Sequence, residues 1–416
     1  MSKPEKNRSK KVRVLHIIAR LNIGGPAIYV TILTDELPKD RFHTQLITGT
    51  VGKDEGDMSY LASEKGVIPF YIPELGREIS FADDLKVLRQ MVMIFNKFKP
   101  DIVHTHTAKA GVIGRLSAIL YNLGKRRKNK VKLVHTFHGH VFHSYFNYIK
   151  TYIFILMERI LGQFTDRIIV VSSLQKEDIC QRFKIAPSRK VRNIPYGIEL
   201  KHFSNYNESL REKARNDLFH IQSTSIVLVG IVGRLTAVKN LHLFIDMVKT
   251  FKELNPNDQI KFIIIGDGEL RRELESYAAK QRVENHIIFA GWQKDMPAVY
   301  HALDIVTLTS KNEGSPFTLI EAMASKKPVV STDVGGVGNL FGKIEESHIN
   351  GYKITKNGIL VSSGDSLSLA KAIKFLIVNP KIAHDLAQNA QDHVLEVYSK
   401  ERLIKDITNL YIELIN

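Results

Sequence analysis

Two glutamates with a short spacing are the residues best suited to chemistry in this chain. Glu313 and Glu321 lie in the segment 311–331, KNEGSPFTLIEAMASKKPVVS. Ser315-Pro316 between them is typical of a helix start, because a hydroxyl can cap free amides and proline suits the first helical position. The amides and partial positive charge of a helix N-terminus favour a phosphate or an electron-rich sugar edge. The segment predicts a nucleotide-sugar site, but a capped surface helix with two solvated glutamates fits it equally well.

Glycine-containing loops follow two buried strands in the same part of the chain. The strand expected at 226–232 runs into Gly233-Arg234 and on to Lys239-Asn240, and the strand at 261–265 runs into Gly266-Asp267-Gly268. Glycines at the ends of strands leave room for a ligand at that sheet edge. Isolated arginines usually form surface ion pairs, but the position of Arg234 in a glycine loop argues against that interpretation.

Histidines gather at strand ends in the first half of the chain. His104, His106, His138 and His140 all fall at the expected carboxyl ends of strands. A zinc site is one interpretation, although no cysteine pair or H-E-x-x-H spacing supports it. The carboxyl edge of an open α/β sheet is its usual ligand crevice, so we favour a role in binding.

Strands and helices must alternate to position these residues. The hydrophobic pattern predicts two successive β/α series, hence an α/β fold with two doubly wound parallel sheets. Turn-forming residues near 191–200 separate the series. We expect a first domain over 1–198, a second over 199–385, and a helical tail over 386–416 that returns to the first domain.

Charge is distributed unevenly. The chain of 416 residues has a net charge of +16, and residues 1–200 hold 33 Lys and Arg against 18 Asp and Glu. Such an excess favours an anionic partner, and the cluster at 125–132 is either a solvated basic loop or a membrane-facing patch. No recognised nucleic-acid motif occurs, so a basic nucleic-acid-binding protein is the weaker alternative.

A reducing compartment suits the composition. The single cysteine, Cys180, excludes an internal disulfide framework. The basic N-terminus has no apolar region of the kind found in signal peptides, and no apolar stretch approaches the length of a membrane span. We therefore expect a cytoplasmic protein, with peripheral association at the inner face of the membrane as an option.

Several motifs in order resemble those of the retaining family 4 glycosyltransferases of the GT-B fold, from Gly24-Gly25-Pro26 to the terminal helix. The specific ones are Gly233-Arg234…Lys239-Asn240, Gly266-Asp267-Gly268 and the E-x7-E motif from Glu313 to Glu321. The segments His104-Thr-His-Thr-Ala-Lys109 and Thr136-Phe-His-Gly-His140 resemble the subset that builds bacterial capsule, O-antigen or exopolysaccharide.

The resemblance implies a role for each matching residue. Arg234 and Lys239 would hold the donor diphosphate, Glu313 would contact the donor sugar, and Glu321 would bind the ribose hydroxyls. His138 would lie near the reacting centre, so His138 and Glu313 are the catalytic candidates. The remaining candidates for the donor are Gly25, Gly266, Ser315, Pro316, Phe317 and Thr318; those for the acceptor are Gly24, His106, Lys109 and His140.

By the same resemblance, the reaction retains anomeric configuration and uses a nucleotide-sugar donor, expected to be UDP-linked, with a lipid-linked saccharide as acceptor. No D-x-D string is present to hold a metal on the diphosphate, so we expect neither a metal nor a cofactor. A transferase with a soluble acceptor and a sugar-nucleotide epimerase remain alternatives.

Overall fold

The computed structural model describes residues 11–22, 24–52, 56–76, 80–138, 148–205 and 208–416. It divides into two compact units, one of residues 1–198 with 400–416 and the other of residues 199–399. Each unit is an α/β body built on one sheet, which confirms the predicted fold class.

The first unit contains a parallel sheet of seven strands among its described residues, in the order β3-β2-β1-β4-β5-β6-β7. Its strands are β1 Val12–Arg20, β2 Phe42–Gly49, β3 Phe70–Tyr71, β4 Ile102–His106, β5 Lys132–Phe137, β6 Arg167–Val170 and β7 Val191–Asn193. Its helices are α1 Gly25–Glu36, α2 Ser59–Glu64, α3 Phe81–Phe98, α4 Ala108–Asn122, α5 Tyr148–Phe164, α6 Ser173–Glu177 and α16 Lys400–Ile415. The apolar strands β1 and β4 lie in the middle, where the strand order reverses.

The second unit has eight strands in its described part, in the order β10-β9-β8-β11-β12-β15-β14-β13. The strands are β8 Val227–Val232, β9 Ile260–Ile265, β10 Ile287–Gly291, β11 Ile305–Leu308, β12 Val329–Thr332, β13 Ile344–Ser347, β14 Tyr352–Thr355 and β15 Gly358–Val361. Six of these strands form parallel pairs, whereas β14 pairs antiparallel with both β13 and β15. The expectation of a wholly parallel sheet is wrong at this edge, because Lys356 and Asn357 turn the chain directly back into β15.

Helices cover the second sheet. They are α7 Lys201–Ser204, α8 Glu208–Phe219, α9 Leu241–Leu254, α10 Arg271–Lys280, α11 Met296–Ala302, α12 Phe317–Ala324, α13 Gly338–Phe341, α14 Ser366–Val378 and α15 Pro380–Val397. Buried side chains of α9 and α14 pack with those of the strands in one hydrophobic core. None of the helices described in either unit has the length and apolar character required to cross a bilayer.

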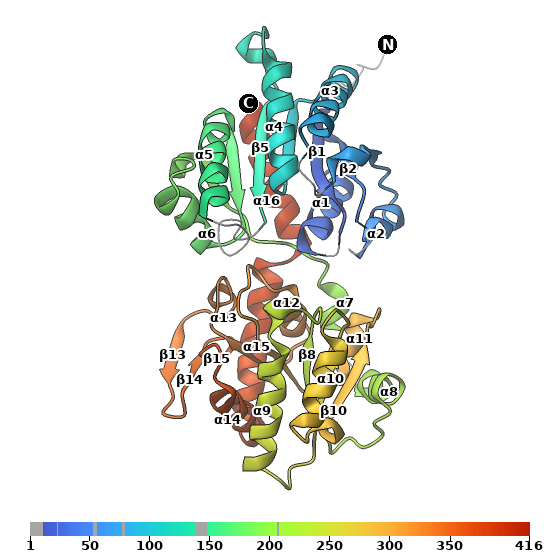
Figure 1. Cartoon of the computed structure of the whole chain (residues 1–416), viewed down its shortest axis with the longest axis vertical. Coiled ribbons are helices and arrows are strands. Elements are labelled where there is room, and N and C mark those ends of the chain that lie inside the picture. Colours follow the sequence, from blue (N-terminus) through green and yellow to red (C-terminus); the bar gives the residue numbers. More distant parts are fainter. Residues whose placement is uncertain (1–10, 23, 53–55, 77–79, 139–147, 206–207) are drawn as a thin grey trace, which may run out of the picture. The chain divides into compact units, whose positions relative to one another are not determined.

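The C-terminal segment passes from the second unit to the first at a later residue than the sequence predicted. Helix α15 packs against α12 and α14 of the second unit, where Gln391 donates a hydrogen bond of 2.8 Å to the carbonyl of Ala324. Only α16 joins the first unit, as its red ribbon shows in Figure 1. The expected boundary at 386 is therefore corrected to Lys400, because Leu386, Ala390 and Val394 are buried against the second unit.

Candidate active site

The second unit presents two loops at the point where its strand order reverses. Strands β8 and β11 are neighbours, while β9 and β12 continue the sheet in opposite directions. The Gly233–Lys239 loop follows β8, and the loop with Ser310 and Glu313 follows β11. A doubly wound sheet binds its ligands at this position, outside the carboxyl ends of the strands.

Lys239 and Glu313 meet directly across these loops. The Lys239 ammonium donates to Glu313 Oε1 at 2.6 Å, and the Ser310 hydroxyl donates to the same oxygen at 2.6 Å. The Thr309 hydroxyl also donates to the carbonyl of Lys239 at 3.0 Å, which joins the two loops. One cation, one carboxylate and one hydroxyl are therefore fixed together, with both charged side chains largely but not fully buried.

Glycines allow the loops to approach closely. A Cβ atom on Gly335 would collide with the carbonyl of Glu313, and one on Gly266 would collide with the carbonyl of Gly233. Gly335 has φ 53° and Gly266 has φ 127°, a region in which side chains are strained. Gly266, which was predicted to bind the donor, therefore packs its backbone directly against the Gly233 loop.

Helix α12 begins one residue later than the capping argument predicted. Its first residue is Phe317, Pro316 precedes it, and no side chain caps it, so the expected cap by Ser315 is wrong. The carbonyl of Pro316 instead accepts from the amides of Leu319 and Ile320. The Thr318 hydroxyl is buried at this helix start and has no hydrogen-bond partner among the described residues.

Glu321 and Arg234 complete the predicted donor residues. Glu321 Oε2 accepts a hydrogen bond of 2.9 Å from the Tyr300 hydroxyl, and burial raises the pKa of Glu321 to about 7. Arg234 is exposed and forms no ion pair with the described residues. The guanidinium is thus available to an anion, whereas the Lys239 ammonium is already paired.

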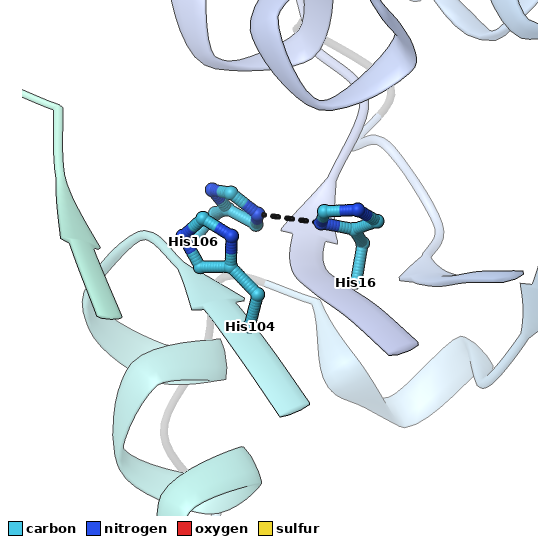
Figure 2. Close-up of side chains that lie close together, drawn as sticks. All are labelled: His16, His104 and His106. Carbon is cyan, nitrogen blue, oxygen red and sulfur yellow. Dashed lines mark hydrogen bonds between the residues drawn. The ribbon is translucent and has the colours of Figure 1, made fainter. Parts of the chain in front are cut away.

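A chain of histidines lies at the middle of the first sheet. His16 Nδ1 is 3.3 Å from His106 Nε2, and His106 Nδ1 is 3.0 Å from His138 Nε2. Figure 2 shows His16 on β1 and His106 on β4 directed at each other, with His104 beside them. His104 bonds Tyr411 of α16 through Nδ1 and Thr136 through Nε2, at 2.6 and 2.7 Å.

The hydrogen bonds of the Tyr196 hydroxyl determine which nitrogen donates in each contact between these histidines. It donates to the carbonyl of His138 at 2.8 Å, so the 3.1 Å contact with His138 Nδ1 requires that nitrogen to carry the proton. His138 Nε2 then accepts from His106 Nδ1, and His106 Nε2 accepts from His16 Nδ1. His16 Nε2 is left as a bare lone pair, and it has no partner within the described part of the chain.

Burial keeps these imidazoles neutral. Desolvation lowers the pKa of His16 and of His138 to about 3, and it holds the pKa of His104 and His106 well below the usual range. Nitrogen atoms of His16, His104 and His106 lie within 4.8 Å of one another, as in a loose metal-ligand set. Both ring nitrogens of His104 and of His106 are engaged in hydrogen bonds, however, so the geometry suits a polar network better than a zinc site.

The remaining site residues predicted in the first unit are Gly24, Gly25, Lys109 and His140. Gly25 opens α1, and the amide of Gly24 donates to Met58 Sδ at 3.3 Å. Lys109 pairs with Asp84 at 3.0 Å and donates to the carbonyl of Glu74, so its ammonium already has protein partners. His140 lies outside the described residues.

Sequence reasoning missed several residues that complete the two sites. Ser310, Tyr300, His16 and Tyr411 contact predicted residues through side chains, and only the position of Ser310 after a buried strand offered a local signal. Thr107 follows His106 with φ 66°, a backbone conformation that is costly for a β-branched residue. Its hydroxyl is buried and without a partner among the described residues.

The fold and the second-unit loops define a class of α/β proteins with two doubly wound domains. The family model for glycosyl transferases group 1 matches residues 212–393, and the model for glycosyltransferase family 4 matches residues 23–202. The chain belongs to the group 1 glycosyltransferases of the GT-B fold.

Relatives of similar length are known. A UDP-Gal:alpha-D-GlcNAc-diphosphoundecaprenol alpha-1,3-galactosyltransferase of Escherichia coli is 27% identical over 99% of this chain and 99% of its own. The capsular polysaccharide biosynthesis glycosyltransferase CapM of Staphylococcus aureus is 24% identical over 82% of this chain and 84% of its own. The crystal structure of Anabaena HepE in complex with UDP has a TM-score of 0.78 at 20% identity, and covers 97% of this chain and 100% of that one.

Proposed function

We propose that this glycosyltransferase moves a hexose or N-acetylhexosamine from a UDP-sugar to a lipid-linked saccharide during polysaccharide biosynthesis. The observation that carries the proposal is the Lys239–Glu313–Ser310 cluster at the reversal point of the second sheet. The full-length similarity to an enzyme named for a UDP-sugar donor and a diphosphoundecaprenol acceptor supports the substrate classes.

In the proposed complex, the diphosphate of the donor lies at Arg234 and Lys239, and the sugar lies at Glu313. Arg234 and Lys239 supply the positive charge that a departing nucleoside diphosphate requires, and the start of α12 adds amides and the unpartnered Thr318 hydroxyl. Glu321 is ionised in the proposed complex and accepts hydrogen bonds from the ribose hydroxyls. These hydrogen bonds offset part of the free-energy cost of burying the charged carboxylate. Glu313 exchanges part of its contact with Lys239 for the hydroxyls of the donor sugar.

We propose that transfer retains configuration and requires no metal. The two cations Arg234 and Lys239 can stabilise the leaving diphosphate, so activity should persist in a chelator such as EDTA. His138 is held neutral with both ring nitrogens bonded, which suits a fixed dipole near the reacting centre better than a proton carrier. Product anomeric configuration, read by NMR, tests retention.

We place the enzyme on the inner face of the cytoplasmic membrane as a peripheral protein, where a lipid-linked acceptor would be found. The basic first 200 residues support this location. Nucleic acid is not an expected partner.

The test of the function is UDP release from a panel of UDP-sugars, with UDP-galactose first, in the presence and absence of a lipid-linked saccharide acceptor. Release should depend on one sugar and on the acceptor, and Glu313→Ala should abolish it. Glu345→Ala, an exposed carboxylate of the same unit, is the matched control. Release without lipid would instead support a soluble acceptor, and no release with any nucleotide-sugar would contradict the transferase assignment to these residues.

Replacing Arg234 tests the diphosphate contact separately from turnover. Arg234→Ala should weaken UDP binding by about 1.5–3 kcal/mol, because it removes a charge-assisted hydrogen bond. Isothermal titration calorimetry measures the change, with Arg272→Ala, an exposed arginine on α10, as the control. Unchanged UDP affinity in Arg234→Ala would refute this role.

A further inference from the structure

Helix α5 turns an apolar face to solvent. Among its described side chains, 151–164, the exposed ones are Tyr152, Ile153, Leu156, Ile160, Gln163 and Phe164. The five apolar members are each 47–60% exposed. They lie opposite the buried residues Glu158, Leu161 and Gly162 on the helix, and no charged residue is among them. A surface helix normally places charged residues on this side.

The two charged residues among the described side chains of α5, Glu158 and Arg159, are used elsewhere. Glu158 is fully buried and accepts two hydrogen bonds, of 2.6 and 2.8 Å, from Arg115 of α4. Arg159 donates to the carbonyl of Phe183. This segment therefore keeps its charges for internal contacts and leaves the outward face apolar.

The neighbouring helix has the same character. Helix α4 contacts α5, and its exposed residues are Leu116 and Leu120, with Leu123 directly after it. Helix α10 of the second unit shows the usual pattern instead, since it exposes Arg272, Glu273, Glu275 and Lys280. We call the exposed residues 116, 120, 123, 152, 153, 156, 160 and 164 the α4–α5 face.

Basic residues flank the α4–α5 face at the ends of both helices. Arg126, Arg127 and Lys130 are exposed in the loop that follows α4. At the end of α5, Phe164 lines a hollow of about 320 Å³ together with Arg167, Arg189 and Lys190. Asp166 lies in the same hollow, Arg167 is paired with Glu413, and Lys190 donates to the carbonyls of Gly162 and Gln163. Arg189 is therefore the exposed cation at this end of α5 that forms no ion pair with the described residues.

We propose that the α4–α5 face docks on a bilayer that contains anionic phospholipids. The apolar side chains would enter the boundary between headgroups and acyl chains, while the flanking cations would contact the phosphates. This inference rests on the proposed function, because a lipid-linked acceptor must be met at a membrane. A second copy of the chain could also cover an apolar face, but self-association would place the same basic clusters in or beside one interface.

Vesicle flotation of the full chain tests this proposal. The protein should float with phosphatidylcholine vesicles that contain phosphatidylglycerol, and float much less with phosphatidylcholine alone or in high salt. Leu156→Glu/Ile160→Glu should reduce partitioning at least about tenfold, because two charges replace buried apolar contacts. Arg126→Glu/Arg127→Glu should reduce partitioning to anionic vesicles by a similar factor.

The matched control is Leu254→Glu/Val378→Glu, which changes two comparably exposed apolar residues at helix ends of the second unit. It should float as the wild type does. Circular dichroism and release of UDP from the donor with a short water-soluble acceptor should be unchanged in every variant, which separates docking from the donor chemistry.

Each outcome has a distinct meaning. Absence of wild-type flotation, or equal flotation of Leu156→Glu/Ile160→Glu and wild type, would overturn the docking proposal even if transferase activity is present. A dimer by light scattering that this variant converts to a monomer, without any flotation, would assign the face to a second copy and also overturn it. Flotation without transfer from any UDP-sugar would uphold docking and refute the proposed function.

Discussion

At the scale of residues, the proposed function requires Glu321 to be ionised, but its buried environment favours the protonated form. Burial raises its pKa to about 7, although the hydrogen bond from Tyr300 acts in the opposite direction. In the unbound protein near neutral pH, a substantial fraction of this side chain is therefore protonated. A ligand that offers two hydroxyl donors would favour the ionised form.

Glu321→Gln should reveal the cost of ionising the buried Glu321 as a change in the free energy of unfolding. In wild type the folded carboxyl stays protonated between its ordinary pKa of 4.5 and about 7, while the unfolded carboxyl ionises. The stabilisation that the raised pKa of Glu321 gives the folded protein is therefore complete below pH 4.5 and is lost as pH rises to 7. Relative to wild type, Glu321→Gln should gain roughly 2 kcal/mol of unfolding free energy between pH 5 and pH 8.

Urea unfolding of both proteins at the two pH values measures that gain. Glu345→Gln, which changes an exposed carboxyl, should show no such pH-dependent difference. A constant difference between Glu321→Gln and wild type at pH 5 and pH 8 would mean that burial does not raise the Glu321 pKa.

At the scale of elements, the sequence predicted most strands and helices because their hydrophobic periods are local. It did not predict the antiparallel β14, since the direction in which a strand pairs depends on a turn and on distant partners. The start of α16 was also misplaced, because α15 and α16 both show the period of an amphipathic helix. The residues alone marked the loops with Glu313 and Lys239 as candidate ligand loops, and the resemblance supplied the roles of these two residues. Their contacts with Ser310 and the contact of Glu321 with Tyr300 depend on tertiary packing.

A buried ion pair joins α4 to α5. Arg115→Leu should destabilise the first unit by about 3–5 kcal/mol, because Glu158 would remain buried without its partner. Arg115→Leu/Glu158→Leu should recover much of this loss, since no buried charge then remains. Denaturant unfolding of both variants measures the coupling, and a double variant as unstable as the sum of two single changes would contradict it.

At the scale of the whole molecule, the first unit is assembled from two distant parts of the chain. Leu403, Ile407, Leu410 and Tyr411 of α16 are buried in that unit, and Tyr411 is a hydrogen-bond partner of His104. The second unit needs no residue beyond 399 and contains all the predicted donor residues except Gly25. The two units should therefore differ in their dependence on the C-terminus.

A chain that ends at Ser399 should lose the first unit and keep the second. Burial of each large apolar side chain of α16 is worth about 1.5–3 kcal/mol, so four of them approach the 5–15 kcal/mol that stabilises a typical domain. Limited proteolysis should degrade residues 11–198 and leave a resistant fragment from 199 onward, which should still bind UDP if the proposed donor site is correct. Removal of Ile415 and Asn416 alone should change neither unit, because both residues are exposed. A first unit that stays resistant without residues 400–416 would show that α16 is an attachment to its core and not a part of it.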